Sequence, residues 1–225
     1  MAEGDQYHDL CTRIIAHCHD RRWFGPDDGL ESYRSFFDST GTLRTIEITH
    51  DARRGFEFSP ATAAQIDETE TVLGFALPPL LRAIYMSVAN GGFGPGQGLT
   101  GASGGYTYGN DDRYSTIEGR TAPIWATEPL DLAEFEASIG RPKRYALPLR
   151  AWPTRFLHLC YWGCNEDSYL DPISGTVYFV GGGPGDYETV LGRQELSLEN
   201  WFETWLRGDW RKWFPQPLDQ PPDSF

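Results

Sequence analysis

A histidine and two cysteines lie close together in the sequence and form the cluster with the clearest chemical potential. His158 and Cys160 stand two positions apart in a segment whose pattern predicts a β-strand, and Cys164 follows just after it. Alternate side chains of a strand share one face, so we expect His158 and Cys160 to point the same way. Zinc prefers such ligands, in sets of four or of three with a water. A fourth ligand, Asp171 or His17, would have to approach from elsewhere in the fold.

The spacing of these residues argues against both chemistries that they suggest. The two cysteines are separated by three residues, whereas zinc sites usually have two residues between a close cysteine pair. A cysteine nucleophile needs a nearby base and a site that stabilises the thiolate. His158 and Cys160 would instead be neighbours along one strand, not aimed at a common substrate. We therefore predict no metal and no cofactor.

Three carboxylates lie around the turn that follows this segment. Glu166, Asp167 and Asp171 are close in sequence, and paired carboxylates act as acid and base in glycoside cleavage. A hydrolase that uses either Cys160 with His158 or Glu166 with Asp171 is thus the catalytic alternative. We favour a solvated acidic rim, because such a rim complements Arg and Lys side chains on a protein partner and speeds encounter.

Two glycine-rich stretches resemble nucleotide-binding loops but lack the residues that such loops need. Residues 181–186 read Gly-Gly-Gly-Pro-Gly-Asp, with no Lys and no Ser or Thr after the glycines, so they do not form a P-loop. The glycines of residues 93–109 do not have dinucleotide-binding spacing and do not precede a helix. We interpret both stretches as loops.

Apolar spacing and capping residues predict the helices that position these segments. A helix is expected over residues 6–22, with Cys11 and Cys18 on its apolar face. Ser59-Pro60 begins a second helix, which ends at Gly74. A third follows Pro78-Pro79 and ends at Asn90-Gly91-Gly92. Its buried face is predicted to comprise Leu77, Leu81, Ile84, Tyr85 and Val88.

The second half of the chain is predicted to be rich in strands. Strands are expected over residues 42–49, 156–161, 167–170 and 176–180, with residues 171–175 as a tight hairpin. A short helix is expected over residues 131–139, and a last one begins at Ser197 with Trp201 and Trp205 facing the core. Helices followed by a run of strands and a closing helix indicate an α+β fold with a mainly antiparallel sheet.

Composition and charge limit the classes of partner. The chain has 225 residues, of which 40% are hydrophobic, so it is long enough for one sizeable core. Its net charge is -13, and we therefore expect it to repel nucleic acid and anionic membranes. Residues 1–9 are polar, no secretory signal is visible, and no stretch approaches the length of a membrane span. We expect a cytoplasmic protein that binds a basic partner.

Three motifs, taken in order, resemble the SMI1/KNR4 proteins of the SUKH superfamily. The first comprises LGFALPP (73–79), LLRAIY (80–85) and ANGGFGPG (89–96). The second is LCYWGC (159–164), followed by a strand that leads to Asp171. The third is SLENWFETWL (197–206), which is similar to the closing helix of the family. The turn at Cys164 departs from the pattern, because Asn165 stands where relatives often have another Gly.

The resemblance implies a fold, a division of the chain and a role. It implies a single α+β domain, a twisted and mainly antiparallel sheet packed by helices, over residues 56–214. Residues 1–55 would be an N-terminal helix with a connecting segment, and residues 215–225 a Pro-rich tail. Bacterial members are mostly immunity proteins that bind and neutralise a toxin domain, and fungal members are regulators. We therefore expect a non-catalytic immunity protein, with a regulatory or scaffold module as the alternative.

The expected contact surface combines loop aromatic residues with carboxylates. Tyrosine supplies contact area at a low entropic cost, and a tryptophan in a turn is often partly exposed. The residues predicted to touch the partner are Tyr106, Tyr108, Tyr114, Trp162, Glu166, Asp167, Asp171 and Asp186. They would contact a basic toxin domain and block its active site or another essential surface.

Overall fold

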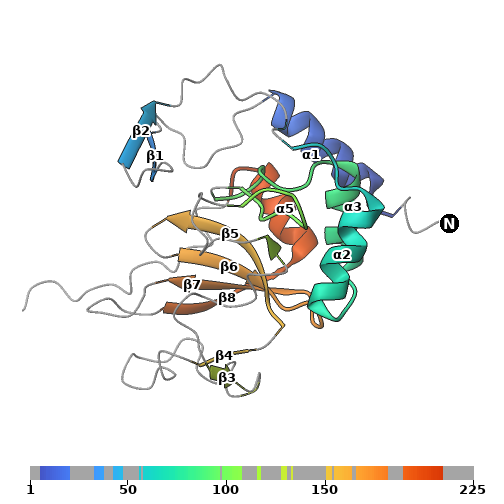
Figure 1. Ribbon diagram of the computed structural model, residues 1–225, viewed down its shortest axis with the longest axis vertical. Helices are drawn as coiled ribbons and strands as arrows, with labels where there is room; N and C mark the ends of the chain where they lie inside the picture. The colour runs from blue at the N-terminus through green and yellow to red at the C-terminus, as the bar shows by residue number, and fades with distance from the viewer. Residues whose placement is uncertain are drawn as a thin grey trace, which may run out of the picture.

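The computed structural model describes residues 6–20, 33–37, 43–47, 56, 58–96, 98–107, 116–117, 128–130, 133, 151–153, 155–163, 166–181 and 190–209. These residues form an α+β arrangement of helices with an antiparallel sheet, which confirms the fold class at that level. Figure 1 shows helices α1, α2 and α3 on one side of the main sheet, with α5 lying between them and the strands.

Helix α2 (Ala63–Leu73) begins later than its sequence predicts. Ser59-Pro60 does not cap it, because this stretch pairs with the end of α3 (Pro79–Ser87): Ala61 N donates to Tyr85 O and Asn90 N donates to Ser59 O. Thr62 is the N-cap, in a reciprocal capping box with Gln65.

The predicted boundary between α2 and α3 is confirmed. Gly74 ends α2 in the left-handed conformation, with φ of 74°, which glycine adopts without a Cβ penalty. A Glu70 carboxylate oxygen then accepts from the backbone N of Leu77 at 2.9 Å and from Arg82 Nη1 at 3.0 Å. The buried face of α3 is also confirmed, because Leu77, Leu81, Ile84, Tyr85 and Val88 are all buried.

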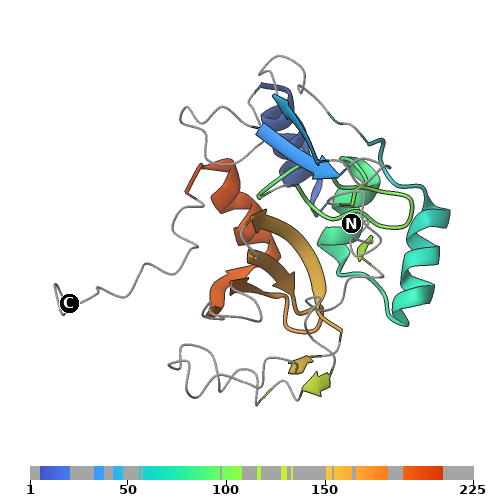
Figure 2. The same ribbon diagram turned by 60° about the vertical axis from the view of Figure 1, so that its left-hand side comes forward.

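The main sheet is an antiparallel meander of four strands in the order β5-β6-β7-β8. Strands β5 (Leu157–Gly163), β6 (Glu166–Leu170) and β7 (Thr176–Gly181) coincide with the predicted strands. Strand β8 (Val190–Ser197) was not predicted, because its sequence lacks a clear apolar alternation. Figure 2 shows the strong twist and curvature of these strands.

Helix α5 (Leu198–Leu206) follows β8 directly and packs on the sheet. The Ser197 hydroxyl accepts from the backbone N of Asn200 at 3.2 Å and caps the helix as predicted. Trp201 and Trp205 are buried together with Leu198 and Phe202, which confirms that these tryptophans belong to the core.

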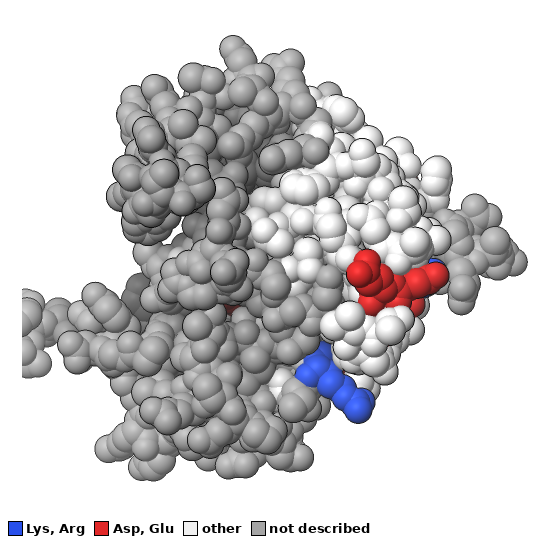
Figure 3. All heavy atoms as spheres, in the orientation of Figure 1, with Lys and Arg blue, Asp and Glu red and all other residues white. Residues whose placement is uncertain are grey.

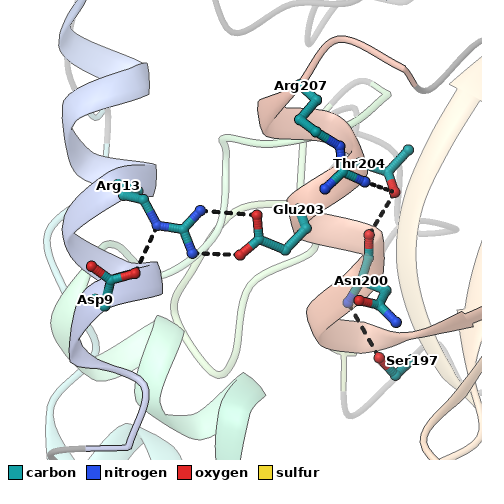
Figure 4. Close-up of polar contacts among 7 residues, drawn as sticks. All are labelled: Asp9, Arg13, Ser197, Asn200, Glu203, Thr204 and Arg207. Atoms are coloured by element: carbon teal, nitrogen blue, oxygen red, sulfur yellow. Dashed lines mark hydrogen bonds and ion pairs between the residues drawn. The ribbon is translucent and has the colours of Figure 1, made fainter.

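Helix α1 (His8–Asp20) joins the same hydrophobic core through Leu10, Cys11, Ile14 and Cys18. On its outer side, the Arg13 guanidinium forms two hydrogen bonds with the Glu203 carboxylate of α5 and one with Asp9 at 2.8 Å (Figure 4). The predicted N-terminal helix therefore contributes buried side chains to the same core as the later helices and strands.

Two small strand pairs complete the described structure. Strands β1 (Tyr33–Phe37) and β2 (Leu43–Glu47) pair antiparallel, and β2 falls in the predicted strand of residues 42–49. Strands β3 (Glu128–Leu130) and β4 (Ala151–Pro153) pair in parallel. The helix predicted over residues 131–139 and the Pro-rich tail lie outside the described residues, apart from a single helical residue at Ala133.

Candidate functional site

The Gly-rich segment, residues 91–107 without Gln97, folds back on itself and against β5. Gly92 N donates to Leu99 O at 2.8 Å, and Gly101 N donates to Tyr106 O at 2.8 Å. Thr100 N donates to Leu159 O of β5, also at 2.8 Å. The described part of this predicted loop is therefore largely buried and hydrogen-bonded to the sheet, rather than a freely exposed contact surface.

Close backbone approach explains why this segment is rich in glycine. A Cβ built on Gly91 would lie 2.6 Å from Leu99 O, and one built on Gly96 would lie 2.5 Å from Tyr161 O. Either distance is shorter than real Cβ contacts allow, so a larger residue would push the segment off its neighbours. These glycines are required by packing, and phosphate binding is not needed to explain them.

Asn90 holds the segment in place with its side chain, a role that sequence reasoning missed. Its Oδ1 accepts from Ala102 N at 2.8 Å, and its Nδ2 donates to Ser103 O at 3.1 Å. Gln65 of α2 also donates to Ser103 O, at 2.9 Å. The only signal in the sequence was an Asn before two glycines, which also fits an ordinary end of a helix.

Tyr106, predicted as a partner-contact residue, is only 5% exposed. Its ring packs edge to face against Phe58, with centroids 5.9 Å apart, and its backbone N donates to Asn90 O. The side chain therefore fills space between the Gly-rich segment and the start of the helical part. Tyr108 and Tyr114, predicted as its companions, lie outside the described residues.

A bulge in β5 overturns the prediction that His158 and Cys160 share a face. His158 pairs with Tyr169 and Cys160 pairs with Ser168, so Leu159 is an extra residue between them. Consecutive residues of β6 point to opposite faces, and their partners on β5 therefore do so too. The thiol–imidazole pair considered from the sequence is not formed.

His158 is fully buried and both of its ring nitrogens have partners. Nε2 lies 2.7 Å from Asp167 Oδ1, and Nδ1 lies 2.6 Å from the hydroxyl of Thr100. The ring edge also faces Tyr169, with centroids 5.2 Å apart. Neither nitrogen is directed at a thiol or at an open surface, so this histidine is not placed as a base for Cys160.

The described residues bring together no set of three or more His, Cys, Asp or Glu side chains that could hold a metal ion. Cys164, the third residue of the proposed zinc set, lies outside them. Cys11 and Cys18 are buried, and burial raises the pKa of both thiols, that of Cys18 to about 12. Such thiols are weak nucleophiles at neutral pH because the thiolate is scarce.

Two of the three carboxylates predicted to form a solvated acidic rim, Asp167 and Asp171, are buried. Asp171 is 3% exposed, and its oxygens accept from Ile173 N, Ser174 N and the Ser174 hydroxyl. Asp167 is buried against His158. Both carboxylates are turned inward because they satisfy polar groups of the fold. The hairpin instead presents Ile173, which is 78% exposed.

Of the remaining predicted contact residues, Trp162, Glu166 and Asp186, only Trp162 has a described side chain. Trp162 is half-buried, and its Nε1 donates to the hydroxyl of Ser168 at 2.9 Å, so part of its ring stays accessible. Glu166 belongs to β6, but its side chain is not among those described, and Asp186 lies outside the described residues.

Acidic side chains do gather on the outer face of α2 (Figure 3). Asp67 and Glu68 are exposed there, and Glu70 is half-buried in its pair with Arg82. Glu68 also accepts from the Ser103 hydroxyl at 2.8 Å, which ties this face to the Gly-rich segment. No motif in the sequence marks these residues.

In the described part of the chain, no helix has both the length and the apolar character needed to cross a bilayer. Comparison of the chain with models of known protein families, with curated proteins and with solved structures gave no match.

Proposed function

We propose that the chain is a protein-binding module of the SMI1/KNR4 type, and that it neutralises a basic toxin domain by occluding it. The observation that carries this proposal is the ordered set of three motifs described above. A single Leu-Pro or Asn-Gly-Gly motif is common at helix ends, whereas the three motifs in this order are more specific. The proposal includes the SUKH-like form of the α+β fold.

The positions of the motif residues support the proposal. Gly74 closes α2, Leu77 is buried before α3, and Asn90 holds the Gly-rich segment. Residues 159–163 of the second motif lie on β5, where Leu159 O accepts from Thr100 N of that segment, and the third motif forms α5 with its N-cap. Each motif therefore has a scaffold role, which is the pattern expected when a family shares a fold rather than a catalytic residue.

The charge of the chain supports the choice of a basic partner. A net charge of -13 over 225 residues attracts a cationic domain and speeds its encounter. The exposed side chains of Asp67 and Glu68 supply part of this negative charge. They stand on α2, whose N-terminus is closed by a capping box. A binder of this kind needs no reacting group, because excluding substrate from the toxin is sufficient.

Co-expression with the product of the neighbouring gene tests the proposal. We expect the chain to protect cells from that product and to form a stoichiometric complex with it that can be purified. A matched control is the Leu81→Asp variant, which places a charge in the core and should lose protection through unfolding. If the neighbouring product still kills and no complex forms, the toxin-neutralising function is refuted. Many weak partners in place of one would indicate the regulatory or scaffold role.

A further inference from the structure

Thr100, His158 and Asp167 form a buried chain of polar side chains that the proposed function does not use. They come from the Gly-rich segment, β5 and β6 respectively, and all three are buried. The histidine stands in the middle, 2.6 Å from the threonine hydroxyl and 2.7 Å from the carboxylate. This histidine is therefore a titratable group at the junction of three separate segments.

The partners of His158 fix where its protons lie in each charge state. An ionised carboxylate only accepts hydrogen bonds, so Nε2 carries a proton that it donates to Asp167. In the neutral ring Nδ1 has no proton and accepts from the Thr100 hydroxyl. In the charged ring Nδ1 has a proton and donates to the same hydroxyl oxygen. A threonine can serve both states because its hydroxyl both donates and accepts.

Several described groups lie around the ring of His158 and around Thr100. Asp167 and Tyr169 face it from β6, and Cys160 follows it on its own strand. From α3, the Tyr85 hydroxyl donates to the carbonyl oxygen of Thr100 at 2.5 Å. Thr100 is thus held by three hydrogen bonds from two elements, α3 and β5, since its backbone N also bonds to Leu159 O of β5.

We propose that His158 is a pH-responsive joint between the sheet and the Gly-rich segment. Protonation at Nδ1 reverses the direction of its hydrogen bond with Thr100, so the threonine hydroxyl keeps its proton but must point that proton away from the ring. The hydroxyl proton no longer binds the ring. The contact of Thr100 with β5 therefore changes with the charge of the histidine. This device acts in the free protein and does not depend on any partner.

Nuclear magnetic resonance of the wild-type chain tests the joint without any substitution. The ring nitrogens of His158 are followed across roughly pH 5 to 8, together with the backbone amides of Thr100 and Gly92. We expect both amides to shift with the same midpoint as the ring. The amide of Gly175, which bonds to Asp171 O in the distant hairpin, serves as the control and should not follow that midpoint.

Three variants distinguish a charge-dependent coupling between His158 and the Gly-rich segment from a merely structural contact. Asp167→Asn should lower the midpoint of the ring by about one pH unit or more, because the charged ring loses an opposite charge. Thr100→Val should uncouple the Gly92 amide from the ring, whereas Thr100→Ser should keep the coupling. The proposal is overturned if the ring does not titrate in the folded protein, or if Thr100 and Gly92 do not move when it does. It is also overturned if Gly92 follows the ring equally well in Thr100→Val.

Discussion

Gly91 and Gly74 form a matched pair for testing the packing of the Gly-rich segment. Their backbones are similar, with φ of 80° and 74°, but their surroundings differ. A Cβ on Gly91 would meet three backbone atoms of Leu99 and Gly101 at 2.6 to 2.8 Å, whereas one on Gly74 would meet nothing within 4 Å. Alanine at either position suffers the same left-handed strain, and only at Gly91 does it also collide with backbone.

The two substitutions are expected to differ by roughly twofold in their effect on stability. The left-handed conformation costs alanine about 1–2 kcal/mol, which sets the expected loss for Gly74→Ala. Gly91→Ala adds a backbone displacement in a packed region, and overpacking of this kind costs a further ~1–3 kcal/mol. We therefore expect a total loss of about 2–5 kcal/mol for Gly91→Ala.

Urea unfolding followed by tryptophan fluorescence measures both losses on the same protein. The unfolding midpoint should fall modestly for Gly74→Ala and strongly for Gly91→Ala, with similar slopes if both variants unfold in two states. Equal losses for the two variants would refute the reasoning, because the close approach of Gly91 to Leu99 and Gly101 would then have no energetic effect.

Three further predictions concern the core and the contact between α1 and α5. Arg13 lowers the pKa of Glu203 below its usual value of 4.5, so their contribution is present above that pH and is lost as pH falls through the lowered pKa. The Arg13 side chain is 43% exposed, so Arg13→Met should cost under about 1 kcal/mol at pH 7, and urea unfolding should show this cost shrink as the pH falls through the lowered pKa of Glu203. Trp201→Ala should cost about 3–5 kcal/mol, whereas Ile173→Ala at the exposed hairpin should leave thermal stability nearly unchanged. Cys18 should resist a thiol reagent at pH 8 until the protein is unfolded, and rapid labelling of the native chain would contradict its burial.

The fold could be predicted where a local pattern and the tertiary packing agree. The apolar faces of α3 and α5 and the hairpin after β6 follow from spacing and from turn residues, and the structure confirms them. The start of α2 could not be placed from Ser59-Pro60, because Ser59 is engaged by Asn90 some thirty residues later. A long-range hydrogen bond of this kind leaves no trace in local sequence.

The candidate site was harder to predict because its geometry depends on one inserted residue. Leu159 looks like an ordinary strand residue, yet the bulge there moves Cys160 to the face opposite His158. The inward turn of Asp171 had a local signal, since an Asp before a tight hairpin often accepts from the backbone N–H groups that follow. The inward turn of Asp167 had no local signal, because its partner His158 lies on the neighbouring strand.

The ion pair between Arg13 and Glu203 has a consequence for synthesis of the chain. Its partners are 190 positions apart, so α1 leaves the ribosome long before α5 exists. At typical rates of about 5–20 residues per second, the interval is roughly 10–40 s. During this time the contacts of α1 with α5 cannot form, whereas those with α3 can, because α3 is synthesised earlier. Synthesis of α5 is therefore the step that completes the packing of α1.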